Sequence, residues 1–496
     1  MSEPQQPSSR REARNLASQG SQGNGGPRDD GSSGGGMPSR TRVGLIAGGL
    51  ALAFVLLGTG AVFAGVAAGK GSTPATSGGA EHSGAPTRTV PADVVAASRI
   101  PTCSIAKAAS NPALQKLYGS VLAVGAVGSP YANNEDDAEA PASAEKVLTA
   151  AAAISKLGPT FRITTSVVDG VTPGSITLVG QGDATLSGVA EGKSVYGGAP
   201  TMASLAAKTL TAYNKAHPGV PITQVVLDAS YWDPSDNWDS TVPRSEQTGG
   251  FLSETTALQV DGDRQDPAAQ VSPRGTDPVM AAGNAFVSAL GLTGVSLITG
   301  QAENGAPTLA SVQSQPVSML VKQMLLTSDN TLAEMLARII SVKSALNGSL
   351  ASLGQAIPAN LSKYGLDNSV VTVHDGSGES PSDQVPASFL AHLMSLVAQG
   401  KNGLNFVAAG IPVSGKTGSL ATRFTGANAD AVGHVSAKPG FIAGSYTLSG
   451  YTRAKDGTLM SFSFFAVGEG VSSSANAALD SLAATVYRCG NNLTSE

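Results

Sequence analysis

The stretch PASAEKVLTAAAAISKLG, residues 141–158, predicts a buried helix that begins near Ser143 and ends at Gly158 and the proline after it. Its interior is rich in alanine, the strongest helix former. Ser143 and Lys146 form an S-x-x-K pattern, and a spacing of about one helical turn places the lysine amine beside the serine hydroxyl. A lysine in that position can take the proton of the hydroxyl. The stretch therefore predicts a serine nucleophile with a lysine base.

The S-x-x-K pattern is short, and it occurs a second time at Ser104 and Lys107. That copy lies beside Cys103 at the start of the body, in a predicted amphipathic helix. Ser143 instead begins a buried helix, where the helix dipole and free backbone N–H groups favour a nucleophile. The alternative for Ser143 is an ordinary capping serine with a lysine on the surface.

A second catalytic pattern, S-x-N, is predicted at Ser328 and Asn330, between the helical sequences PVSMLVKQMLLT and TLAEMLARIISV. A serine and an asparagine in such a tight turn can point into a shared cleft. The same pattern occurs in a loop and at the cap of the last predicted helix, at Ser235–Asn237 and Ser474–Asn476.

The first 100 residues fall into three parts that differ in composition. Residues 1–42 are polar and rich in glycine, and predict a disordered cytoplasmic tail. Residues 43–69 carry no charge and follow several arginines, which predicts a single membrane-spanning helix with the later residues outside the cytoplasm. A cleaved signal peptide is the alternative. Residues 70–100 predict an extended linker.

The remaining body, of about 400 residues, predicts no metal, cofactor or nucleic-acid site. Its charge is mildly acidic without a basic stripe, and the whole chain has five histidines and two cysteines. Cys103 and Cys489 lie at opposite ends of the body, where a disulfide would join its first helix to its last; two free thiols are the alternative. Residues 410–417 match a nucleotide-binding P-loop pattern, but no long helix follows them.

Four stretches, in this order, resemble the D-alanyl-D-alanine carboxypeptidase/endopeptidase family of low-molecular-mass penicillin-binding proteins, class C type, and in particular its actinobacterial members. The likeness runs from about Cys103 to Cys489. The four stretches are residues 141–158, LVGQGDATLS at 178–187, SDNTLAEMLAR at 328–338 and HDGSGESPSDQVP at 374–386.

The resemblance implies an α/β (α+β) fold of the serine β-lactamase and penicillin-binding transpeptidase type. A five-stranded antiparallel sheet with helices would be formed by residues 101–165 and 305–496. The family inserts extra domains between its first two boxes, which here implies an inserted, β-rich region at residues 166–304.

The third box of the family, K-T/S-G, lies on the edge strand of that sheet, and two lysines compete for it. KTG begins at Lys416, but only KPG at Lys438 is followed at once by two more strand patterns and a closing helix. The stretch GKTGSLATRF instead matches a G-T-L…R element upstream of the box, through Gly418, Ser419, Leu420 and Arg423. We therefore expect Lys438 in the box.

Pro439 departs from the family pattern, in which the middle residue is threonine or serine and its hydroxyl helps to bind the terminal carboxylate of the substrate. Proline fixes φ and removes an N–H donor. An edge strand tolerates it when that N–H faces outward. We expect the fold to survive and substrate contacts to be lost.

The resemblance implies a serine-type D-Ala-D-Ala carboxypeptidase/endopeptidase that acts on peptidoglycan stem peptides through an acyl-enzyme and is acylated by β-lactams. It also implies that Lys146 activates Ser143 and that Ser328 and Asn330 complete the catalytic set. Lys438, Gly440 and Phe441 would bind the substrate, and the backbone N–H groups of Ser143 and Phe441 would stabilise the oxyanion. An inactive, anchored cell-wall scaffold and a β-lactamase are the alternatives.

Overall fold

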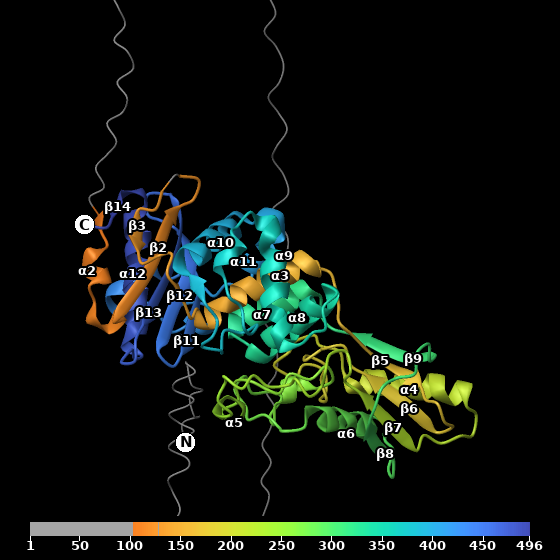
Figure 1. Ribbon diagram of the computed structural model, residues 1–496. Helices are drawn as coiled ribbons and strands as arrows, with labels where there is room; N and C mark the ends of the chain where they lie inside the picture. Colours follow the sequence, from red (N-terminus) through yellow and green to blue (C-terminus); the bar gives the residue numbers. More distant parts are fainter. Residues whose placement is uncertain (1–102, 127) are drawn as a thin grey trace, which may run out of the picture. The chain divides into compact units, whose positions relative to one another are not determined.

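The computed structural model describes residues 103–126 and 128–496 (Figure 1). The predicted tail, membrane span and linker lie outside the described residues. Within the described ranges, no helix combines enough length with enough apolar character to cross a bilayer.

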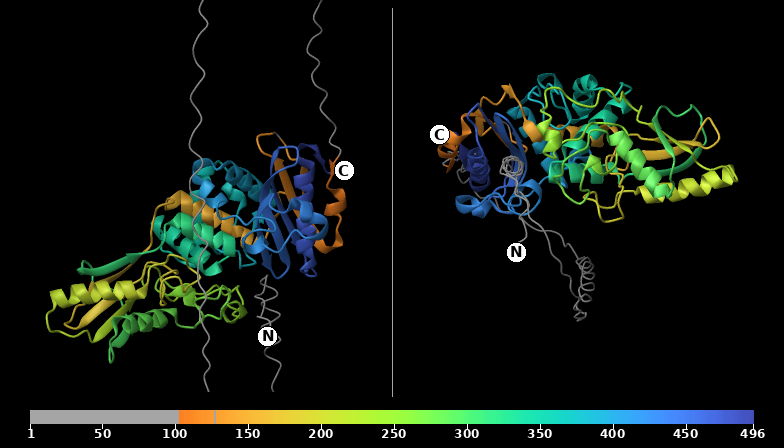
Figure 2. Two further views of the ribbon diagram at one scale, coloured as in Figure 1. Left: turned by 180° about the vertical axis from the view of Figure 1, so that it is seen from behind. Right: turned by 90° about the horizontal axis from the view of Figure 1, so that it is seen from below.

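An antiparallel sheet with the strand order β11-β12-β13-β2-β3 confirms the predicted five-stranded sheet. Strand β2 pairs with β13 over the whole length of β2, so segments from the two ends of the described chain share one sheet. Figures 1 and 2 show the blue C-terminal strands beside the orange β2. The strands are β2 (Lys116–Ala123), β3 (Tyr131–Asn133), β11 (Val435–Ile442), β12 (Ser445–Arg453) and β13 (Leu459–Val467).

Helices cover both faces of this sheet. Helix α10 (Ala387–Gln399) packs against β2, β12 and β13 on one face, and α12 (Ser474–Cys489) packs against β12 and β13 on the other. Because side chains alternate along a strand, β13 contributes apolar side chains to both faces of the sheet. Phe465 joins the buried cluster on the α10 face, whereas Phe462 and Phe464 join the cluster on the α12 face.

Helix α3 (Lys146–Lys156), predicted from its alanines, lies at the centre of the helical part. It is entered through a 3₁₀ turn, η2 (Ala142–Glu145). The side chains of residues 146–153 are buried without exception, because small alanines let the neighbouring helices approach closely. These neighbours are α7 (Val317–Thr327), α8 (Asn330–Lys343), α9 (Leu353–Leu361) and α11 (Asn405–Ala408).

A second five-stranded sheet has the order β8-β7-β6-β5-β9. Its strands β6, β7 and β8 lie in the region that was expected to be an insertion, residues 166–304, whereas β5 begins before that region and β9 lies after it. The expectation of a β-rich region is incomplete, because β6, β7 and β8 are parallel and parallel neighbours need a crossover, here a helix each time. Helix α4 (Met202–Ala216) joins β6 to β7, and α6 (Pro278–Leu290) joins β7 to β8. The strands are β5 (Thr164–Asp169), β6 (Ser175–Val179), β7 (Gln224–Asp228), β8 (Ser296–Thr299) and β9 (Thr308–Gln313). The division into domains itself stays a prediction.

The predicted disulfide is present between Cys103 and Cys489, whose Cα atoms are 5.4 Å apart. Cys489 ends α12 as expected, but Cys103 lies in a short strand, β1, rather than in a helix, because it pairs with the strand β14 that follows α12. The remaining short elements are β1 (Cys103–Ser104), α2 (Ala106–Ala109), β4 (Ala138–Glu139), α5 (Ser245–Thr248), β10 (Val385–Pro386) and β14 (Leu493–Thr494).

Candidate active site

Ser143 lies in the 3₁₀ turn at the entrance of α3 and is 4% exposed. Lys146 is the first residue of α3 and is fully buried. Its Nζ donates a hydrogen bond of 2.9 Å to Ser143 Oγ and one of 2.6 Å to the Ser377 carbonyl oxygen. The turn therefore places the hydroxyl and the amine of the S-x-x-K pattern in direct contact.

The S-x-N pattern occupies the predicted turn between α7 and α8. Ser328 adopts a left-handed backbone conformation with φ 58° and ψ 42°, which is uncommon for a residue other than glycine. Its Oγ accepts a hydrogen bond of 2.9 Å from Lys438 Nζ. Asn330 begins α8 and is buried, and its Oδ1 has no hydrogen-bond partner among the described residues.

Strand β11 brings the third box to the other two. Lys438 is buried there, and its Nζ also donates to the Pro439 carbonyl oxygen at 2.7 Å. Gly440 lies against the turn that carries Ser143, so closely that a Cβ at this position would be 2.8 Å from the Ser143 nitrogen. The Phe441 ring packs on Tyr446, with ring centroids 4.5 Å apart. The three boxes thus converge at the edge of the sheet.

The backbone of β11 explains how the strand accommodates Pro439. The Ala437 N–H donates to the Pro412 carbonyl at 2.9 Å, and the Val435 carbonyl accepts from Ser414 N–H at 2.9 Å. Both bonds point away from β12, and residues two apart in a strand face the same way. The missing N–H of Pro439 therefore falls on this outer edge, as does the N–H of Phe441, and the ladder to β12 continues.

The competing residues lie elsewhere. Lys416 is exposed in a turn, while Leu420 is buried and Arg423 forms an ion pair of 2.6 Å with Asp480 of α12. Ser104 and Lys107 are both exposed, and Ser104 Oγ accepts the N–H of a residue at the start of α2. The other S-x-N serines, Ser235 and Ser474, are exposed, and Asn237 and Asn476 are half-buried.

One loop contributes to the site although the sequence analysis assigned no role to its residues. The Asp375 carboxylate accepts the backbone N–H groups of Ser377 at 2.8 Å and Gly378 at 2.5 Å, and this turn directs the Ser377 carbonyl to Lys146. A Cβ on Gly378, which has φ 75°, would lie 1.9 Å from the Ala142 carbonyl oxygen. The sequence signal is an aspartate followed by Gly-Ser-Gly, a combination typical of a tight turn.

Two buried glutamates, Glu334 and Glu145, interact with the Asp375 turn that contacts Lys146. Burial is the main cause that raises the pKa of Glu334 to about 8, and the charge of Asp375 adds to the effect. The Gly376 N–H donates to the Glu334 carboxylate and opposes the rise. Burial, and then Asp375, also raises the pKa of Glu145 well above its usual range, while Lys146 opposes the rise. Both acids are held away from water, and Glu145 lies close enough to Lys146 for the two charges to interact.

The substitution Glu334→Gln is expected to weaken the pH dependence of stability. In the unfolded chain Glu334 ionises near its ordinary pKa of 4.5, whereas in the folded protein it keeps its proton up to about pH 8. The folded state therefore binds more protons between these values, and stability falls as the pH rises from about 4.5 to about 8. The variant should lose less stability across this range, by on the order of 1 kcal/mol or more.

Urea unfolding at pH 5 and pH 8 would measure the effect. Glu191→Gln, at an exposed glutamate, is the control and should leave the pH dependence unchanged. If the free energy of unfolding changed by the same amount between pH 5 and pH 8 in the wild type and in Glu334→Gln, the raised pKa of Glu334 would be contradicted.

The sheet, the buried helix that begins at the S-x-x-K turn, the S-x-N turn and the lysine on the edge strand together define a penicillin-binding protein of the serine type. The profile of the D-Ala-D-Ala carboxypeptidase 3 (S13) family matches residues 102–275 and 239–486. The chain belongs to this family.

Curated relatives agree with this assignment. The chain is 30% identical over 404 residues to a carboxypeptidase of Mycobacterium tuberculosis, and 29% identical over 396 residues to carboxypeptidase DacB of Mycolicibacterium smegmatis. Each match covers 78% of this chain and 84% of the relative.

Among solved structures, penicillin binding protein 4 of Haemophilus influenzae has the same fold, with a TM-score of 0.62 and 19% identity over 76% of this chain and 99% of that chain. The same protein complexed with a novel β-lactam matches with a TM-score of 0.58.

Proposed function

We propose that the protein is a serine-type D-Ala-D-Ala carboxypeptidase/endopeptidase that cleaves peptidoglycan stem peptides through an acyl-enzyme. The observation that carries the proposal is the contact of 2.9 Å between the buried Lys146 amine and Ser143 Oγ, at the point where Gly440 of β11 abuts the same turn. The curated relatives named as carboxypeptidases support the same reaction.

In the acylation step, Ser143 Oγ attacks the carbonyl carbon between the two D-alanines while Lys146 takes the hydroxyl proton. The negative charge that develops on the carbonyl oxygen is stabilised by two backbone donors, the N–H groups of Ser143 and Phe441. The outward direction of the backbone at the edge of β11 supports this role for Phe441.

The S-x-N pair and the third lysine complete the reaction. Ser328 relays a proton to the leaving D-alanine nitrogen, and Lys438, in contact with Ser328, attracts the terminal carboxylate. Asn330 orients Lys146 and the substrate amide, and its buried Oδ1 is available as an acceptor among the described residues. Water then releases the acyl group from the serine. β-Lactams acylate the same serine but are released slowly.

The position of Lys438 supports its choice over Lys416. Lys438 is buried with its amine 2.9 Å from Ser328 Oγ, whereas Lys416 is exposed in a turn. The sequence KTG at residues 416–418 is then a chance match to the box.

The proposal places the body outside the cytoplasm, held to the membrane by the helix expected at residues 43–69. The disulfide between Cys103 and Cys489 supports an oxidising location. Peptidoglycan is the expected partner there.

Pro439 favours a second candidate function. Without the hydroxyl and N–H that threonine would supply, the protein would bind the cell wall as an anchored scaffold with weak or no catalysis. The fold and the Ser143–Lys146 contact would be unchanged in that case.

Release of D-alanine from a stem pentapeptide separates the two functions. The purified protein is expected to release the terminal alanine from a peptide ending in D-Ala-D-Ala, but not from the matched peptide ending in D-Ala-L-Ala. A β-lactam should block the release. A protein that releases no D-alanine and is not labelled by a fluorescent penicillin would contradict the enzymatic proposal and support the scaffold.

A further inference from the structure

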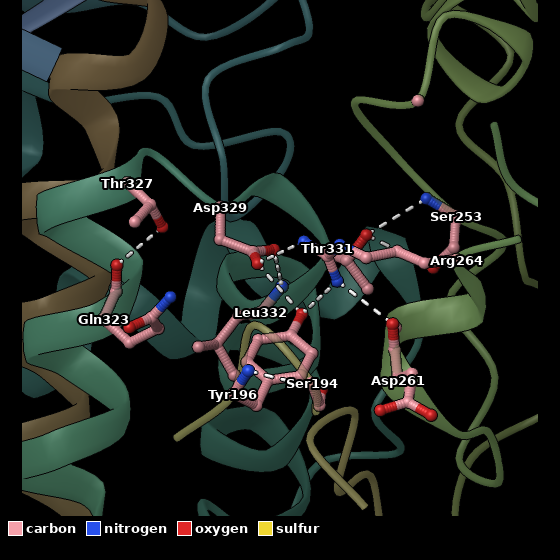
Figure 3. Close-up of polar contacts among 12 residues, drawn as sticks. Ser194, Tyr196, Ser253, Asp261, Arg264, Gln323, Thr327, Asp329, Thr331 and Leu332 are labelled. Carbon is pink, nitrogen blue, oxygen red and sulfur yellow. Dashed lines mark hydrogen bonds and ion pairs between the residues drawn. The ribbon is translucent and has the colours of Figure 1, made fainter. Parts of the chain in front are cut away.

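The middle residue of the S-x-N turn, Asp329, has no part in the reaction proposed above, yet its carboxylate is fully satisfied. Oδ1 accepts the Leu332 N–H at 3.0 Å and so caps α8. Oδ2 accepts from Arg264 Nη2 at 2.9 Å and from the Tyr196 hydroxyl at 2.9 Å. Figure 3 shows the Asp329 carboxylate between these groups.

Both partners of Oδ2 come from the expected insertion, residues 166–304. Arg264 and Asp329 are each only 1% exposed, so the ion pair is removed from water. Arg264 also donates to the Tyr196 hydroxyl at 2.8 Å and lies over the Tyr196 ring, 4.9 Å from its centroid. The three groups form a closed set, in which each contacts the other two.

The backbone that carries Arg264 is constrained as well. The three residues before it, 261–263, all have positive φ values. Arg274, itself buried, donates to the Gly262 carbonyl inside this turn. Burial alone would raise the pKa of Asp329, but the Arg264 and Arg274 guanidinium groups hold it below its ordinary value. Asp329 is therefore a charged acceptor in a rigid frame.

A helix cap needs only one carboxylate oxygen, and here Oδ1 supplies it. The contacts of Oδ2 are additional, and they fix the position of Asp329, which lies between Ser328 and Asn330. Ser328 is held in a left-handed conformation that its neighbours must maintain. A buried ion pair fixes orientation effectively because loss of either partner leaves the other charge without compensation.

We propose that Arg264 and Tyr196 are positioning residues for acylation: through Asp329 they hold Ser328 and Asn330 in place, so that the insertion sets the rate of the reaction at the S-x-N turn. The inference rests on the proposed function for its kinetic consequence. Its structural part, the fixation of residues 328–332 by the insertion, is independent of activity.

The chain offers matched controls. Arg338 is also a buried arginine that joins α8 to the expected insertion, through an ion pair of 2.7 Å with Asp236. It lies about 12 Å further along α8 from Asn330, at 1.5 Å per residue. Tyr213 is a buried tyrosine whose hydroxyl accepts the Gly174 N–H at 3.1 Å, away from the turn.

The test compares Arg264→Lys with Arg338→Lys, and Tyr196→Phe with Tyr213→Phe, in the full-length protein. Arg264→Lys is expected to lower the rate of acylation by a fluorescent penicillin about tenfold, as expected when a charged hydrogen bond is lost, and Tyr196→Phe several-fold. With the stem pentapeptide, kcat should fall while KM stays within about twofold, because an interaction needed only in the transition state is lost. The two control variants should acylate at the wild-type rate.

Hydrogen–deuterium exchange gives a readout that does not require activity. Amides of residues 328–332 should exchange faster in Arg264→Lys and Tyr196→Phe than in their controls. Unchanged exchange there, or equal loss of acylation in both members of a pair, would overturn the inference. A wild-type protein that is not acylated at all would refute the proposed function, and the exchange data would still decide the positioning role.

Discussion

Ser143→Ala is expected to abolish covalent labelling by a fluorescent penicillin and to lower D-alanine release by roughly a thousandfold or more. The acyl-enzyme requires an oxygen nucleophile, and alanine has none. The fold should be retained, because the side chain removed is small and Lys146 keeps its hydrogen bond of 2.6 Å to the Ser377 carbonyl. Labelling followed by gel electrophoresis, together with a D-alanine assay, would measure both effects.

Ser104→Ala is the matched control for this substitution. Ser104 is the serine of the other S-x-x-K pattern, and it is exposed. Its replacement should leave labelling and D-alanine release at wild-type levels. Label retained by Ser143→Ala, or lost in Ser104→Ala, would assign the nucleophile to a different residue and contradict the proposed mechanism.

Pro439→Thr is expected to raise the acylation rate roughly ten- to a hundredfold. Threonine restores an N–H on the outer edge of β11 and a hydroxyl beside Lys438, and a hydrogen bond to a charged carboxylate contributes on the order of 1.5–3 kcal/mol. Position 439 is half-buried on the edge strand, and threonine is favoured in strands, so the substitution should not disturb the sheet. Stopped-flow measurement of penicillin acylation would give the rate.

Lys416→Ala serves as the control for the assignment of the third box. Lys416 is exposed, so its removal should change acylation little. A fall in acylation in Lys416→Ala, combined with no gain in Pro439→Thr, would move the box to residues 416–418. A measurable wild-type rate that rises in Pro439→Thr would also identify the wild-type protein as a weakened enzyme rather than an inactive scaffold.

Local features of the site could be predicted from sequence because they depend on short spacing. The alanines of α3 specify a buried helix, and the spacing of Ser143 and Lys146 places their side chains together at its start. The turn between α7 and α8 followed from two helical patterns with a serine and an asparagine between them. The order of strands β11, β12 and β13 before a closing helix followed from alternation.

The features that were missed depend on contacts between distant segments. The Asp375 turn was expected only as a family signature, because nothing local shows that the Ser377 carbonyl reaches Lys146. The inserted region was expected to be β-rich, but the parallel pairing of β6, β7 and β8 requires helices between these strands. Strand pairing is set by partners far along the chain, which periodicity does not identify.

The sequence by itself determined several elements around the site, the family, and the candidate nucleophile with its neighbouring base. The family followed from the order of four short stretches, and the nucleophile and its base followed from residues within one helical turn of each other, where spacing alone fixes proximity. Only the tertiary structure decided that Lys438 reaches Ser328, that Gly440 abuts Ser143, and that Arg264 pairs with Asp329. These contacts join residues far apart in the chain, and the packing of the sheet, the helices and the second sheet brings them together.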